Sequence, residues 1–245
     1  MTEDGARGVA LEPPTADVSA SPNRRLGRQI ILTEAVRFID THGRDRLTMR
    51  RLGSVLGVEA MALYRYVPGR EQLLDGVVEY VMNELYESTM RQAVPDSWQE
   101  YLQQMAHGVR SVAVRHPRVF PLVATRPPAA PWLRPPLRSL EWVEAFLDGL
   151  ASEGFDDDSA VGAYRAFTSF LLGHLLLEVA THGADVGPLD VLEEAQEPGR
   201  STLVDYPSVR RLRASLSEDH AAVEFEESLE ELLDRIALMV SSKSA

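Results

Sequence analysis

Apolar residues recur every three or four positions along most of this chain, which is the spacing of α-helices with one buried face. We find no convincing stretch that alternates apolar and polar residues as a half-buried strand would. The pattern predicts helices over residues 24–42, 49–56, about 59–66, 68–90, 97–116, 137–152, 157–181 and 219–240. The sequence therefore predicts an all-α protein.

Glycine and threonine mark the ends of the first helices. Gly43 follows the first helix, and glycine can take the left-handed conformation that closes a helix. Thr48 is a plausible N-cap for the second helix, which Gly57 ends. Only one or two residues separate Gly57 from the third helix, and Pro68 is expected at the first position of the fourth. Two short helices around a glycine turn predict a helix-turn-helix.

Three stretches interrupt the helical pattern. Residues 1–23 contain glycine, proline and small residues without an apolar period, and we expect a disordered arm there. Prolines crowd residues 117–136, so only short turns are expected in that stretch. Residues 183–207 form a polar connection whose length is typical of a functional or mobile loop.

Charge is distributed unevenly between the two parts of the chain. The net charge of −12 would by itself disfavour a nucleic-acid partner. Residues 24–70, however, hold ten arginines and four acids, a net charge of +6, whereas residues 71–245 carry −15. Because a binding footprint is a property of a local face, we predict a basic helix-turn-helix domain at 24–70 and an acidic helical domain at 71–245.

Composition excludes several classes of protein. The 245 residues are 44% hydrophobic and 25% charged, close to globular averages. The absence of cysteine excludes disulfide scaffolds, thiolate zinc sites and a cysteine nucleophile. The longest apolar stretch, 167–180, is interrupted by His174 and Glu178 and is too short to span a bilayer. We expect a soluble cytoplasmic protein.

The third predicted helix carries the candidate chemistry. Leu63 is expected to face the core, which leaves a small, aromatic and basic outer face suited to the major groove of DNA. Arginines that begin the second and fourth helices would flank the groove and clamp phosphates, helped by a threonine and tyrosine hydroxyls. The candidate DNA-binding residues are Thr48, Arg50, Ala60, Met61, Tyr64, Arg65, Tyr66 and Arg70. The alternative for the two tyrosines is that they pack between helices.

Residues 47–67, with the following Arg70-Glu71-Gln72-Leu73-Leu74, resemble the DNA-binding segment of the tetracycline repressor family, and the likeness covers about residues 26–80. The remainder is similar to the ligand-binding and dimerisation domain of that family. The short segments on which this second resemblance rests are Ser97-Trp98-Gln99-Glu100, Thr125-Arg126-Pro127 and Gly154-Phe155. The resemblance implies a homodimeric transcriptional regulator, most often a repressor, in which an effector swings the fourth helix and releases palindromic operator DNA.

Departures from the family concern the effector. On this resemblance, Leu122 stands where the family has the histidine that meets antibiotic-bound magnesium, and Met105 and Val109 replace a polar amide and an aromatic ring. We therefore expect no response to tetracycline with magnesium, and a largely apolar organic effector gated by residues 183–207. The expected pocket residues are Tyr86, Met105, Val109, Leu122, Val123, Phe170 and His174. The alternative is that these residues simply fill a core.

The remaining hypotheses concern assembly and rival functions. Helices 157–181 and 219–240 offer more apolar face than a monomer hides, and we expect Phe170, Leu229 and Leu233 at the seam between protomers. The six histidines show no metal-ligand spacing, so no metal or cofactor is expected. The rival to a regulator is a helical protein-interaction platform with a vestigial DNA domain. An enzyme is a remote third reading, because one regular helix cannot supply a nucleophile elbow and an oxyanion hole.

Overall fold

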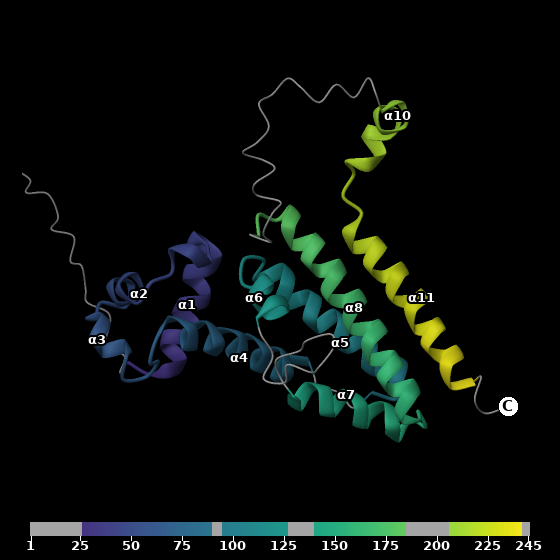
Figure 1. Ribbon diagram of the computed structural model, residues 1–245, viewed down its shortest axis with the longest axis horizontal. Coiled ribbons are helices and arrows are strands. Elements are labelled where there is room, and N and C mark those ends of the chain that lie inside the picture. Colours follow the sequence, from purple (N-terminus) through teal and green to yellow (C-terminus); the bar gives the residue numbers. More distant parts are fainter. Residues whose placement is uncertain (1–25, 90–94, 127–139, 185–205, 242–245) are drawn as a thin grey trace, which may run out of the picture.

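The computed structural model describes residues 26–89, 95–126, 140–184 and 206–241. All of the regular secondary structure in these residues is helical. The N-terminal part contains α1 (Arg28–His42), the short η1 (Arg44–Arg46), α2 (Met49–Leu56) and α3 (Ala60–Leu63). The helices α4 (Arg70–Thr89), α5 (Trp98–Arg115), α6 (Phe120–Thr125), α7 (Leu140–Ser152), α8 (Asp157–Thr181), α10 (Pro207–Leu216) and α11 (Ala221–Ser241) follow. Figure 1 shows the small N-terminal domain beside the larger helical one. The all-α prediction is confirmed.

Local sequence signals end the first helices as predicted. Gly43 closes α1 with a φ of 84°, and its N–H donates to the carbonyl of Ile39 at 2.7 Å. The Thr48 hydroxyl caps α2 by accepting a hydrogen bond from the Arg51 N–H at 3.2 Å. Gly57 ends α2 in the left-handed region, with a φ of 68° and a ψ of 28°.

The first helix packs on α4 at close range. A Cβ atom at Gly76 of α4 would lie 2.8 Å from the end of the Leu32 side chain, so a larger residue there would require Leu32 to shift. The guanidinium of Arg28 also pairs with the Glu79 carboxylate at 2.7 Å. Because α4 contacts α5 and α6 as well, it belongs to both domains and connects them.

Helix α8 lies at the centre of the larger domain, where it contacts α5, α6, α7 and α11. By length and composition alone it could cross a membrane. Its packing is instead that of a core helix, since Phe167, Leu171 and Leu175 are buried. Its buried Glu178 carboxylate accepts two hydrogen bonds from Arg110, at 2.6 and 3.1 Å.

Two helices that were not predicted, and two helix ends, are the main differences from the sequence prediction. Helix α6 forms inside the proline-rich stretch, because Pro121 occupies its first turn, where a missing N–H costs nothing. Helix α10 begins at Pro207 and was not predicted. All of its side chains are exposed, so its sequence lacks the periodic apolar residues of a helix that packs against a core. Helix α4 starts at Arg70 rather than at Pro68, and α3 ends at Leu63, with a turn over residues 64–66.

The predicted arm at 1–23 and most of the predicted loop at 183–207 lie outside the described residues.

Candidate DNA-binding face and effector pocket

The helix-turn-helix is held together at Gly53. Its carbonyl accepts a hydrogen bond from the Val58 N–H at 2.9 Å, which turns the chain from α2 toward α3. A Cβ atom added at Gly53 would lie 2.8 Å from the Val58 carbonyl oxygen and 3.3 Å from the Ala60 nitrogen. The close crossing of the two helices therefore depends on a glycine at this position.

The outer face of this motif is aromatic and basic. Leu63 is fully buried, as predicted, whereas Met61 is 74% exposed, Tyr64 42% and Tyr66 41%. The tyrosines therefore do not simply pack between helices within this chain. Arg50 and Arg65 are also exposed, as is Thr48, while Ala60 is half-buried.

Arg70 has a role inside the protein. Its guanidinium donates to the backbone carbonyl of Leu47 at 3.1 Å and to that of Arg44 at 3.2 Å. These carbonyls belong to the connection between α1 and α2, so Arg70 fixes α4 against the helix-turn-helix. Contact of Arg70 with a DNA phosphate stays a prediction.

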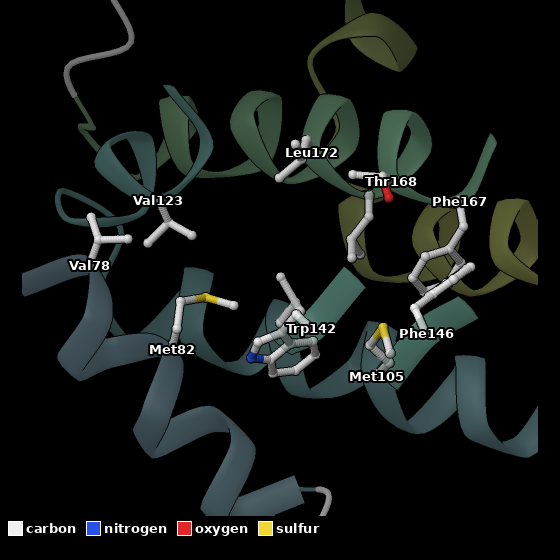
Figure 2. Close-up of a pocket in the computed structure, with 11 residues that line it drawn as sticks. Val78, Met82, Met105, Val123, Trp142, Phe146, Phe167, Thr168 and Leu172 are labelled. Carbon is white, nitrogen blue, oxygen red and sulfur yellow. The ribbon is translucent and has the colours of Figure 1, made fainter. Parts of the chain in front are cut away.

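A pocket lies inside the larger domain, between α4, α5, α6, α7 and α8, as Figure 2 shows. It contains about 640 Å³ of space between atoms, part of it open to solvent, but little of this space is wide enough for a water molecule. A drug-sized occupant would therefore displace side chains. The residues that line it are Val78, Met82, Met105, Val109, Val123, Trp142, Phe146, Phe167, Thr168, Leu171 and Leu172.

Met105, Val109 and Val123 were predicted in this pocket, and the structure places all three there. The sequence analysis missed the wall supplied by α7 and α8, including Trp142, Phe146 and Thr168. A cluster of aromatic residues at helical spacing was the available signal, but the same pattern also marks ordinary core, so it did not single out a pocket.

The other predicted pocket residues lie elsewhere. Leu122 is buried but lines a separate cleft beside Arg44 and Arg118, because it points away from its neighbour Val123 on the short α6. Leu122, which was predicted among the pocket residues, therefore does not line this pocket. The side chain of Tyr86 lies outside the described residues.

Phe170 and His174, which were predicted in the pocket, contact α11 and do not line it. Their rings lie 5.7 and 5.3 Å from the ring of the fully buried Phe225, measured between centroids. The guanidinium carbon of Arg110 lies 5.3 Å from the centre of the same ring. This aromatic cluster joins α8 to α11 inside one protomer.

Leu229 and Leu233 were predicted at the protomer seam and are already buried in the single chain, at 1% and 5% exposure. They pack in the core that α11 shares with α8, so little of their surface is left for a partner. The exposed apolar side chains of these two helices are Val161, Leu177, Val223 and Leu238.

The pocket residue Thr168 contacts Tyr164, a tyrosine whose pKa is raised. Burial raises the pKa of the Tyr164 hydroxyl from its ordinary 10.0 to about 12, and a hydrogen bond with Thr168 opposes the rise. Among the described residues, no group of histidine and carboxylate side chains is arranged to hold a metal ion.

The helices from α5 onward correspond to a known domain. The model of the tetracyclin repressor-like C-terminal domain matches residues 92–240. The chain belongs to the tetracycline repressor family.

Similar proteins support this membership along most of the chain, including the helix-turn-helix. The HTH-type transcriptional repressor DrrR1 of Streptomyces coeruleorubidus is 26% identical over 239 residues, covering 92% of this chain and 82% of the relative. The crystal structure of a possible TetR family transcriptional regulator from Streptomyces coelicolor A3(2) is 27% identical with a TM-score of 0.66, covering 86% of this chain and 98% of that one.

A second solved structure shares the fold. The Streptomyces coelicolor TetR family protein ActR, in complex with actinorhodin, is 22% identical with a TM-score of 0.63 and covers 87% of this chain and 96% of its own. This member of the tetracycline repressor family therefore combines a helix-turn-helix with a helical domain that carries a pocket.

Proposed function

We propose that this protein is a ligand-responsive DNA-binding transcriptional regulator that acts as a repressor, released from its operator by a small organic, largely apolar effector. The observation that carries the proposal is the joint presence of an exposed aromatic and basic helix-turn-helix face and an apolar pocket, connected by α4. Family membership and the repressor DrrR1 support it.

The DNA-binding face divides into two kinds of residue. Arg50, with the Thr48 hydroxyl, lies at the start of α2 and is proposed to grip phosphates. Met61, Tyr64 and Arg65 lie on and just after α3 and are proposed to meet base edges, with Ala60 close to the DNA and the Tyr66 hydroxyl on the backbone. Arg70 is proposed to act chiefly by holding α4 against this face.

The pocket determines the class of effector. Among the eleven described lining residues, Thr168 is the one with a hydroxyl and Trp142 adds an indole N–H, while the others are hydrocarbon, thioether or phenyl groups. An effector held here is therefore mostly apolar and aromatic, with a single polar group aimed at Thr168. ActR binds actinorhodin in the solved complex, which supports an organic ligand of this kind.

Two copies of the chain are proposed to bind one palindromic operator. One helix-turn-helix reads one half-site, so a dimer is needed to grip two. The α8 and α11 helices expose Leu177 and Leu238 at 68% and 69%, which supports this face as the seam in place of the buried Leu229 and Leu233. The protein is proposed to work in the cytoplasm and to have no catalytic role.

Selection of duplex DNA from a random pool tests the function. The wild-type protein is expected to enrich a palindromic sequence, whereas the double variant Arg50→Ala with Arg65→Ala is expected to enrich none. The control is Arg37→Ala, because Arg37 is an exposed arginine of α1, outside the helix-turn-helix, that pairs with Glu34. A wild-type protein that enriches no sequence would favour the interaction-platform alternative.

A further inference from the structure

The segment around α6 contacts the pocket on one side and α4 on the other. All five residues Phe120–Ala124 are buried, and Val123 is the one that lines the pocket. The Arg126 N–H ends α6 by donating to the Leu122 carbonyl at 3.1 Å. A displacement of Val123 by an occupant therefore moves the base of the Arg126 side chain as well.

Arg126 is bound to α4 by several hydrogen bonds. Its Nε donates to the Asp75 carboxylate at 2.8 Å, and its Nη2 lies 2.6 Å from the same oxygen. Nη2 also donates to the Glu71 carbonyl at 3.1 Å and to the Glu71 carboxylate at 3.0 Å. The side chain is only 13% exposed, so water competes weakly for these bonds.

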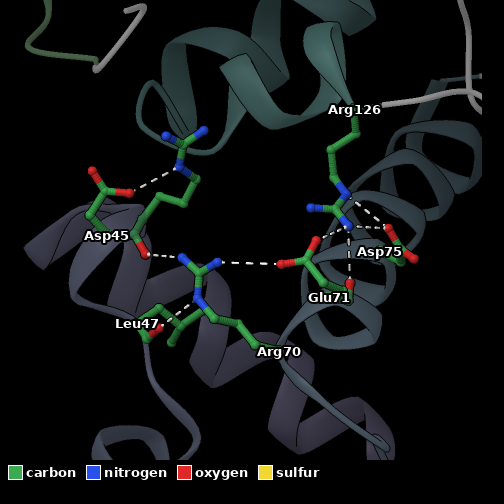
Figure 3. Close-up of polar contacts among 7 residues, drawn as sticks. Asp45, Leu47, Arg70, Glu71, Asp75 and Arg126 are labelled. Atoms are coloured by element: carbon green, nitrogen blue, oxygen red, sulfur yellow. Dashed lines mark hydrogen bonds and ion pairs between the residues drawn. The ribbon is translucent and has the colours of Figure 1, made fainter.

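The contacts continue from α4 to the helix-turn-helix, as Figure 3 shows. The second carboxylate oxygen of Glu71 lies 3.5 Å from Nη1 of Arg70. Arg70 in turn donates to the carbonyls of Arg44 and Leu47, and Leu47 directly precedes Thr48, the N-cap of α2. One continuous set of polar contacts thus joins the end of α6 to the start of α2.

We propose that Arg126 is the positioning residue that couples the pocket to the DNA-binding face, through Glu71 and Asp75 of α4 and then through Arg70. The proposal rests on the proposed function and assigns the coupling to a particular side chain. Arg126 touches neither effector nor DNA. It converts a movement of α6 into a movement of the first turn of α4 and of the connection between α1 and α2.

The test replaces the unknown effector by a substitution that fills the pocket. Val123→Phe pushes α6 from the pocket side, and the milder Val123→Leu serves if the larger ring prevents folding, as judged by circular dichroism. Affinity for a duplex selected by the wild-type protein is measured by fluorescence anisotropy. Filling the pocket is expected to raise the dissociation constant for the duplex at least about tenfold, within the usual range of allosteric coupling.

The same substitution is then made in the Arg126→Gln background. The change is expected to fall to less than about threefold there, because the push no longer reaches α4. Arg126→Lys keeps one charge without the planar fork and is expected to give an intermediate value. An equal change in the wild-type and Arg126→Gln backgrounds, or none in either, would overturn the proposal.

Arg118→Gln is the matched control. Arg118 also joins the segment between α5 and α6 to the N-terminal domain, but through the carbonyl of Thr41 at 3.1 Å, at the end of α1. The pocket-filling change is expected to survive in this background. If Arg118→Gln abolishes it as fully as Arg126→Gln does, the coupling does not belong to Arg126 and the proposal fails.

Hydrogen exchange of the free protein gives a readout independent of DNA. Arg126→Gln is expected to speed exchange of the amides at residues 44–48 and 70–76, while Arg118→Gln leaves them unchanged. Unchanged exchange in Arg126→Gln would overturn the proposal. A protein that selects no duplex but shows the expected exchange would count against the proposed function and in favour of the contact path itself.

Discussion

Arg50 and Arg65 are both exposed arginines of the helix-turn-helix, but their positions predict different effects. Arg50→Ala at the start of α2 is expected to weaken binding to all duplexes alike and to lower the salt dependence by about one unit of slope. Arg65→Ala is expected to change which bases are preferred, at about 1–3 kcal/mol for the affected position. Anisotropy titrations at several salt concentrations measure both effects. An unchanged slope for Arg50→Ala would contradict its role at a phosphate.

Tyr164 predicts a fall in stability at alkaline pH. Its pKa is about 12 in the folded protein against 10.0 ordinarily, so the unfolded chain releases the proton first as pH rises. The free energy of unfolding is therefore unaffected by this group below pH 10 and falls progressively between pH 10 and 12. Urea unfolding of wild type and Tyr164→Phe is expected to show a shallower decline for the variant in that window. Parallel declines would show that the hydroxyl titrates normally.

At the scale of elements, the helices and their caps were largely predictable, because local sequence decides them. Gly43, Thr48 and Gly57 each end or begin a helix as expected. Helix α10 was missed because it buries no residue, and periodicity detects only a helix that has a buried face. The burial of Leu229 and Leu233 inside one protomer depends on how α11 sits on α8, which periodicity along either helix does not determine.

The crossing of α2 and α3 gives a test with an internal control. Gly53→Ala is expected to destabilise the protein by about 1–3 kcal/mol, because its Cβ would meet the Val58 carbonyl oxygen at 2.8 Å. Gly173→Ala in α8 meets no atom within 4 Å and is expected to stabilise its helix by about 0.5–1 kcal/mol. Thermal unfolding followed by circular dichroism compares the two. Equal effects would contradict the close helix crossing.

The residues that line the pocket predict which ligands do not bind. Magnesium requires near-octahedral oxygen ligands, and the described lining residues offer no carboxylate or histidine. A tetracycline chelate in this pocket would leave its polar groups without hydrogen-bond partners, which costs about 1–3 kcal/mol of binding free energy for each group. Calorimetry is expected to show no magnesium-dependent binding of tetracycline. Micromolar binding that requires magnesium would contradict the pocket assignment and leave the DNA-binding face unaffected.

At the scale of the whole molecule, assembly depends on the exposed face of α8 and α11. Aspartate at Leu177 and Leu238 places charges on surfaces that are 68% and 69% exposed in the single chain, so the fold is expected to survive. Sedimentation is expected to show a dimer for the wild type and a monomer for the Leu177→Asp, Leu238→Asp variant. The monomer is expected to lose operator affinity, since both half-sites must be held at once. A wild-type monomer at micromolar concentration would contradict this arrangement.

The ratio between specific and non-specific DNA affinity tests the central claim most directly. A fluorescent duplex selected by the protein is titrated at physiological salt beside a scrambled duplex of the same composition. A sequence-reading regulator is expected to bind the selected duplex at least about a thousandfold more tightly, as two protomers per duplex. Equal affinity for the two duplexes would contradict the account and leave a helical domain without a sequence-specific partner in DNA.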